Sequence, residues 1–188
     1  MPDPVQLLPA DVFLTRSKTV LGSLIRFFTR AFGESRTKVN HVGVVVEAGD
    51  ARTAVGVEAL AFVQKHRLWS RYGNSRRHQV AVYRPLGISA EDVAKIVHGA
   101  EKDVGQEYGK VMIVAHLLDY LLLGAFVFRR LIRAEDYPIC SWVVAWAYAK
   151  AGRDFGVPPA AASPDDIWDY VRRHTHEFEE VLPLGPLA

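Results

Sequence analysis

Residues 41–46, His-Val-Gly-Val-Val-Val, decide the fold of this chain, because they form a short apolar run with high β-propensity. The run predicts a central strand of a sheet. Side chains alternate along a strand, so His41, Gly43 and Val45 share one face, while residues 42, 44 and 46 share the other. Because glycine has no side chain, we expect open space beside the His41 imidazole on its face of the sheet.

Further strands and helices follow from the spacing of apolar residues. The sequence predicts strands over residues 11–16, 54–61 and 79–84, and helices over residues 19–32, 89–105, 111–132 and 140–151. Ser163-Pro164-Asp165-Asp166 starts a last helix, with a capping serine, a first-turn proline and two acids. Early strands followed mostly by helices predict an α+β domain, in which a largely antiparallel sheet packs against helices.

The composition indicates a single globular domain over residues 1–188. With 49% hydrophobic and 23% charged residues, the chain resembles ordinary soluble proteins and is long enough to bury a sizeable core. A formal charge of +2 is too small to indicate a nucleic-acid partner. The single cysteine excludes an intramolecular disulfide, and the first residues show no secretory pattern, so we expect a cytoplasmic protein. No pattern in the sequence indicates the oligomeric state.

Two segments raise the question of membrane contact. Residues 111–128 are strongly apolar, but His116 and Asp119 interrupt them, and their length is at the lower limit for a bilayer span. We therefore predict a buried or groove-covering helix, within an apolar helical insertion over residues 111–133. Residues 18–38 carry basic side chains on an amphipathic pattern, which favours a solvated helix face. Peripheral membrane contact through 111–128 or 18–38 is the alternative.

Cys140, the only cysteine, stands where a helix is predicted to begin. Pro138 precedes it, an apolar run follows it, and Gly152 ends the pattern. A thiol in the first turn faces unpaired backbone N–H groups and the positive end of the helix dipole. Both favour the thiolate, which is the nucleophilic form. The alternative is a buried cysteine that only fills space.

Three other residues could act together with such a thiol. His41 is either a catalytic base or a strand-end histidine bonded to a neighbouring loop. Glu58 is the only charged residue in the segment 54–61, so it either orients an imidazole or faces water from an edge strand. Tyr108 follows Gly105 in a glycine-bounded turn, where it either directs its hydroxyl at a developing oxyanion or packs at a helix junction.

The order of these motifs resembles that of one family. The motifs are His41-Val42-Gly43-Val44-Val45, Glu58-Ala59, Gly105-x-x-Tyr108, Cys140-Ser141 and Ser163-Pro164. In this order they resemble the circularly permuted NlpC-type cysteine hydrolases, papain-like proteins of the YiiX group, in which the histidine precedes the cysteine. Residues 9–14 also resemble that family's first strand, although Ala10 stands where the family usually has glycine. The resemblance covers residues 8–168.

The resemblance implies a permuted papain-like core in which Cys140 is the nucleophile, His41 the base and Glu58 the residue that orients His41. It also implies that Tyr108 lines an oxyanion site together with the Cys140 backbone N–H. The implied function is that of a cysteine hydrolase or acyltransferase, which cleaves an amide or ester bond through an acyl-enzyme. The family favours a peptide or isopeptide substrate of cell-wall type.

Two alternatives to a cell-wall amidase stay open. The apolar segment between Tyr108 and Cys140 is unusually long for the family, and it favours a lipid acyl substrate. A non-catalytic ligand-binding module on the same fold is the alternative of another class, since a fold does not determine a function.

No cofactor or metal site is predicted. His174 and His176 lack the i, i+4 spacing of the helical zinc motif, so we expect a charged helix end there. Ser141 lacks the glycine-flanked elbow of serine hydrolases. Trp142 and Trp146 share one helix face, and we expect both to pack in the core.

Overall fold

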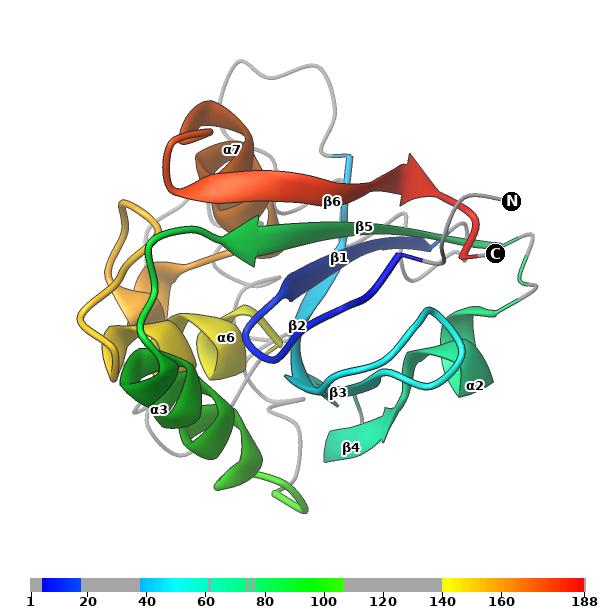
Figure 1. Ribbon diagram of the computed structural model, residues 1–188, viewed down its shortest axis with the longest axis horizontal. Helices are drawn as coiled ribbons and strands as arrows, with labels where there is room; N and C mark the ends of the chain where they lie inside the picture. Colours follow the sequence, from blue (N-terminus) through cyan, green and yellow to red (C-terminus); the bar gives the residue numbers. More distant parts are fainter. Residues whose placement is uncertain are drawn as a thin grey trace, which may run out of the picture.

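An antiparallel sheet of six strands organises the described part of the chain, in the order β4-β3-β2-β1-β5-β6 (Figure 1). The computed structural model describes residues 5–17, 38–60, 62–73, 75, 77–106 and 140–187. The strands are β1 (Val12–Ser17), β2 (His41–Glu47), β3 (Val55–Ala59), β4 (Val63–Arg67), β5 (His78–Pro85) and β6 (Phe178–Gly185). Every neighbouring pair is antiparallel. The predicted α+β fold with an antiparallel sheet is confirmed.

Three helices cover one face of this sheet. They are α3 (Ala90–Glu101), α6 (Cys140–Ala149) and α7 (Pro164–Arg173), and the short 3-10 helix η2 (Pro159–Ala161) precedes α7. The valines at positions 42, 44 and 46 of β2 share a hydrophobic core with buried residues of all three helices. The alternation predicted for β2 is therefore confirmed, and it places the start of α6 against the start of the central strand.

A smaller core covers the opposite face. The short helix α2 (Leu68–Tyr72) follows β4 directly, and its two terminal residues pack with Phe13 and Val45. In Figure 1, α2 lies away from α3, α6 and α7, beside the β3–β4 edge of the sheet. This second face is the one toward which His41 and Gly43 point by alternation.

The expectation of open space at Gly43 is wrong. A Cβ atom at this position would lie 2.2 Å from Cζ of Phe13, so the aromatic ring occupies the room that the glycine leaves. Gly56 on β3 has the same role, since a Cβ there would lie 2.7 Å from Cε1 of Phe13. Both glycines therefore allow one large ring to pack directly against the backbone of the sheet.

Three elements carry no clear sequence signal. The edge strand β4 has four polar residues after Val63, and only that valine is buried. The edge strand β6 contains two glutamates and Pro183, which is tolerated because an edge strand has unpaired backbone groups. Helix α2 has only five residues, which is too short to show helical periodicity. Edge strands and single turns depend on their neighbours, so local patterns do not predict them.

The predicted helix starts hold where the structure describes them, but α3 ends at Glu101, four residues before the stop predicted at Gly105. Ser163 caps α7 in a capping box with Asp166, as the motif predicts. Gly152 adopts a φ of 69° after the end of α6, a conformation that glycine tolerates best. One expectation for α6 is wrong, because Trp146 is 44% exposed while Trp142 is buried and donates from its indole to the Ala160 carbonyl.

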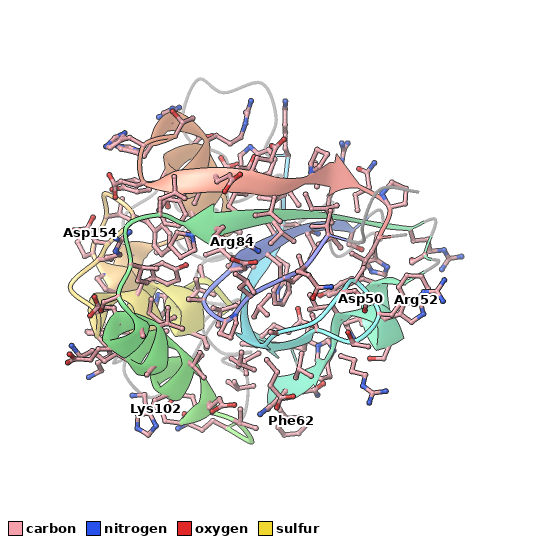
Figure 2. The ribbon with its side chains drawn as sticks, viewed as in Figure 1. Asp50, Arg52, Phe62, Arg84, Lys102 and Asp154 are labelled. Atoms are coloured by element: carbon pink, nitrogen blue, oxygen red, sulfur yellow. The ribbon has the colours of Figure 1, made fainter. Side chains whose placement is uncertain are left out.

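The buried acid Asp11 joins β1 to β5. The guanidinium of Arg84 donates to both of its carboxylate oxygens, at 2.9 and 2.8 Å, and the Leu8 backbone N–H donates to one of them. Figure 2 shows Arg84 on β5 beside the start of β1. Since Asp11 is fully buried, this two-point contact supplies the partner that its charge requires.

Several predictions fall outside the described residues. These are the helices over 19–32 and 111–132, the basic side chains of residues 18–36, the apolar segment 111–128 and Tyr108. Among the helices that the structure does describe, none has the length and apolarity needed to cross a membrane.

Candidate active site

The Cys140 side chain lies at the N-terminus of α6, against the start of β2. Cys140 is 5% exposed, and the helix packs on β2 and β3. Burial alone raises the pKa of the thiol, but the His41 side chain and the backbone N–H groups of Val42 and Ser141 lower it below its ordinary value. A helix N-terminus and a nearby imidazolium are the environments in which cysteines become nucleophilic. The surroundings of Cys140 therefore favour the thiolate.

His41, the first residue of β2, links Cys140 to Glu58. Its Nε2 lies 2.5 Å from Oε2 of Glu58, and its side chain also hydrogen-bonds the Cys140 thiol. Since Nε2 is engaged by the carboxylate, Nδ1 is the ring nitrogen available to the sulfur. The imidazole thus contacts the Cys140 thiol on one side and the Glu58 carboxylate on the other.

The two negative partners of His41 determine its charge. Burial would lower the pKa of His41, but the Cys140 thiolate and the Glu58 carboxylate together raise it to about 10. The same pairing lowers the pKa of Cys140, so the contact favours a thiolate–imidazolium pair. Because the two groups titrate as a pair, each charge depends on the presence of the other.

Strand register explains how Glu58 reaches His41. Glu58 on β3 is paired with Gly43 on β2, so both point to the same face. His41 is two residues before Gly43 on that face, which places it diagonally across from Glu58, within reach of a long side chain. The register therefore decides between the two interpretations of Glu58, because it turns the carboxylate away from water and toward the imidazole.

The Glu58 carboxylate is fully buried and accepts three hydrogen bonds. Its Oε2 accepts from His41 and from the Tyr72 hydroxyl at 2.5 Å, and its Oε1 accepts from Nε2 of His66 at 2.5 Å. The guanidinium Nε of Arg71 lies 3.7 Å from Oε1. Although burial raises the pKa of Glu58, His41, His66 and Tyr72 lower it well below its ordinary range. The group is therefore a carboxylate at neutral pH.

The structure brings together three of the four predicted site residues, Cys140, His41 and Glu58. The fourth, Tyr108, lies outside the described residues. His66 and Tyr72 also belong to the site and are missed by the sequence analysis. Both come from β4 and α2, the two elements without a clear sequence signal, and only the nearness of His66 to Glu58 along the chain could have suggested it.

Comparisons with known proteins identify a structural neighbour. No family model and no curated protein matches the chain. The crystal structure of metalloprotein yiiX from Escherichia coli O157:H7, DUF1105, aligns with a TM-score of 0.52 and 18% identity, over 96% of this chain and 90% of that one. At this identity the likeness shows the fold alone. The neighbour is itself a member of the YiiX group, the group whose motif order the sequence resembles.

Proposed function

We propose that this protein is a cysteine hydrolase or acyltransferase that cleaves an amide or ester bond through an acyl-enzyme. The observation that carries the proposal is the position of His41, which contacts the Cys140 thiol on one side and the buried Glu58 carboxylate on the other. A nucleophile, a base and a residue that orients the base are the minimum for this chemistry. The YiiX-like fold is compatible with it.

In the proposed mechanism, the Cys140 thiolate attacks the substrate carbonyl carbon and the carbonyl π electrons move to oxygen. The resulting oxyanion is stabilised by the Cys140 backbone N–H, and we assign Tyr108 to the same role on the basis of the family resemblance. The His41 imidazolium then gives its proton to the leaving group as the C–N or C–O bond breaks. Next, His41 takes a proton from water, or from an acceptor alcohol or amine, which attacks the thioester and releases Cys140. Glu58 stabilises the imidazolium throughout.

The test is alkylation of Cys140 with iodoacetamide as a function of pH, followed by mass spectrometry. We expect the wild-type thiol to react faster than a free cysteine at pH 6 to 7, because the thiolate persists below the ordinary thiol pKa. His41→Ala removes the cation, and because burial alone raises the pKa of the thiol, the rate should fall to that of a free thiol or below it. A wild-type rate equal to that of free cysteine, unchanged by His41→Ala, would refute the proposed nucleophile and favour a non-catalytic binding module.

Two substrate classes follow from the sequence. We propose a peptide or isopeptide of cell-wall type first, and a lipid acyl chain as the alternative, because residues 111–128 are strongly apolar. Muropeptides and phospholipid vesicles, each incubated with wild type and with Cys140→Ser, distinguish them. Release of peptide or amine supports the first class, and release of fatty acid supports the second.

A metal ion does not fit the described residues of this site. The neighbour yiiX is a metalloprotein, and a bound metal ion requires several donor side chains around a common point. Within the described ranges, no group of three or more His, Cys, Asp or Glu side chains is arranged around a common point. The two Glu58 oxygens each lie 2.5 Å from a histidine nitrogen, so these donors bond to one another in a chain. We therefore derive no step through a metal.

A further inference from the structure

His66 differs from an ordinary histidine because acceptors surround both of its ring nitrogens. Its Nδ1 lies 2.9 Å from the Arg67 carbonyl oxygen, and its Nε2 lies 2.5 Å from Oε1 of Glu58. A carbonyl and an ionised carboxylate can only accept hydrogen bonds, so both nitrogens must carry a proton. The geometry therefore requires His66 to be an imidazolium whenever Glu58 is a carboxylate.

The sheet register explains why two histidines share one carboxylate. His66 on β4 is paired with Gly56, and Glu58 is paired with Gln64, so His66 lies diagonally across from Glu58 on one side. His41 lies diagonally across on the other side, on β2. Glu58 is thus the central acceptor of a row that crosses three strands, with a cation at each end.

We propose that His66, as an imidazolium donating from both ring nitrogens, is a positioning residue that holds the Glu58 carboxylate for His41 and makes the alignment of the site depend on the proton of His66. The proposal rests on the cysteine hydrolase function proposed above. When His66 loses a proton, one of its two hydrogen bonds must break. Glu58 then loses a neighbouring positive charge in either case, and it also loses a donor when Nε2 is the nitrogen that is deprotonated. No covalent bond changes in this step.

The surroundings of His66 bear on how it titrates. Glu58 on β3 stabilises the imidazolium, while Arg71 on α2 opposes it. His41 is bonded to the other oxygen of the same carboxylate, and as an imidazolium it repels a second cation there. The hydrogen bond to Glu58 raises the pKa of His66 above its ordinary value although burial lowers it. The side chain is 18% exposed, so the proton can exchange with solvent while Glu58 stays buried.

The first measurement is NMR of the imidazole nitrogens in Cys140→Ser, which needs no catalytic activity. This substitution also removes the thiolate that raises the pKa of His41, so the pKa of His41 falls into a range that is easier to measure. We expect His66 to carry protons on both nitrogens at neutral pH and to titrate above the ordinary histidine range. A His66 with one unprotonated nitrogen at neutral pH and an ordinary titration would overturn the proposal.

The second measurement compares the titration of His41 in His66→Gln and in a control. Glutamine keeps an N–H donor for Glu58 but carries no charge, so it removes the cation that competes with His41 for the carboxylate. We expect the pKa of His41 to rise by about one unit, since two cations bonded to the two oxygens of one carboxylate oppose each other even after solvent screening. Lys65→Gln changes the neighbouring residue of β4, which pairs with Glu47 and Glu101, and should leave His41 unchanged.

These outcomes separate the two proposals. An unchanged His41 titration in His66→Gln, together with a fast-reacting Cys140 in the wild type, overturns the role of His66 and leaves the hydrolase standing. A slow-reacting Cys140 together with a doubly protonated His66 and a shifted His41 overturns the hydrolase but leaves His66 as the residue that positions Glu58. In an active enzyme, we also expect the pH profile of kcat for His66→Gln to lack one alkaline ionisation that the wild type shows.

Discussion

Replacing the buried Glu58 carboxylate by an amide tests the electrostatics of the site most directly. In Glu58→Gln the negative charge next to Nε2 of His41 disappears, while the size of the side chain is kept. Two unit charges about 4 Å apart attract by about 4 kcal/mol at an effective dielectric constant near 20. This corresponds to roughly three pKa units. The pKa of His41, about 10 in the wild type, should therefore fall to roughly 7.

The consequence is a loss of the thiolate–imidazolium pair on the alkaline side of neutrality. At pH 8, His41 is protonated in the wild type and mostly neutral in the variant, so the general acid for the leaving group is missing. The assay is NMR titration of His41, combined with the ultraviolet absorbance of the thiolate and the pre-steady-state acylation rate. We expect the alkaline limb of acylation to move down by about the same three units.

Glu101→Gln is the matched control, because Glu101 is also a hydrogen-bonded carboxylate but pairs with Lys65 at the surface. It should leave the titration of His41 unchanged. Circular dichroism and urea unfolding establish that Glu58→Gln is folded, since the amide cannot accept all three hydrogen bonds and costs about 1 to 3 kcal/mol for each group left unpaired. A folded variant whose His41 still titrates near 10 would refute the role assigned to Glu58.

The remaining predictions concern stability. The raised pKa of His41 and the lowered pKa of Cys140 oppose each other in the stability of the fold, because the folded pair and the unfolded chain each hold one proton between pH 6.5 and 9.0, the ordinary values of the two groups. Urea unfolding should therefore change little over that window and decline as the pH rises from 9.0 toward 10, where the unfolded chain has lost both protons and the folded pair still holds one. Gly43→Ala should destabilise by about 1 to 3 kcal/mol because its methyl group meets the Phe13 ring, and Phe13→Leu in the same chain should recover part of the loss in thermal unfolding. Arg84→Met leaves Asp11 buried without its cation, and should cost about 3 kcal/mol in urea unfolding at pH 7 but much less at a pH low enough to protonate Asp11.

Local sequence patterns predicted the elements that carry Cys140 and His41. The apolar run after His41 has the β-propensity of a buried strand, and the apolar segment after Cys140 has a helical stop at Gly152. The capping motif at Ser163 likewise marks a helix start, because the two residues that bond in it, Ser163 and Asp166, are three positions apart in the chain. Such signals can be recognised in the sequence because the residues that form each one are close together along the chain.

Other features of the site were not readable in the same way. Gly43 suggested a gap beside His41, whereas the structure fills that gap with Phe13 from β1. The polar strand β4 has no periodic signal, so nothing in the local pattern marks His66 as part of the site. Trp146 shares a helix face with Trp142 by spacing, yet it is exposed. The sequence could not predict this, because nearly the whole circumference of α6 is apolar and no periodicity marks its solvent side.

Sequence alone thus determined where the only thiol and a strand-end imidazole stand along the chain, and that a lone acid lies in an apolar strand. Only the tertiary structure decided that these three groups meet. The physical reason is the register of β2, β3 and β4 together with the packing of α6 on β2 and β3, both of which are set by contacts between residues far apart in sequence. A shift of β3 by one residue would turn Glu58 to the opposite face and leave both histidines without their shared carboxylate.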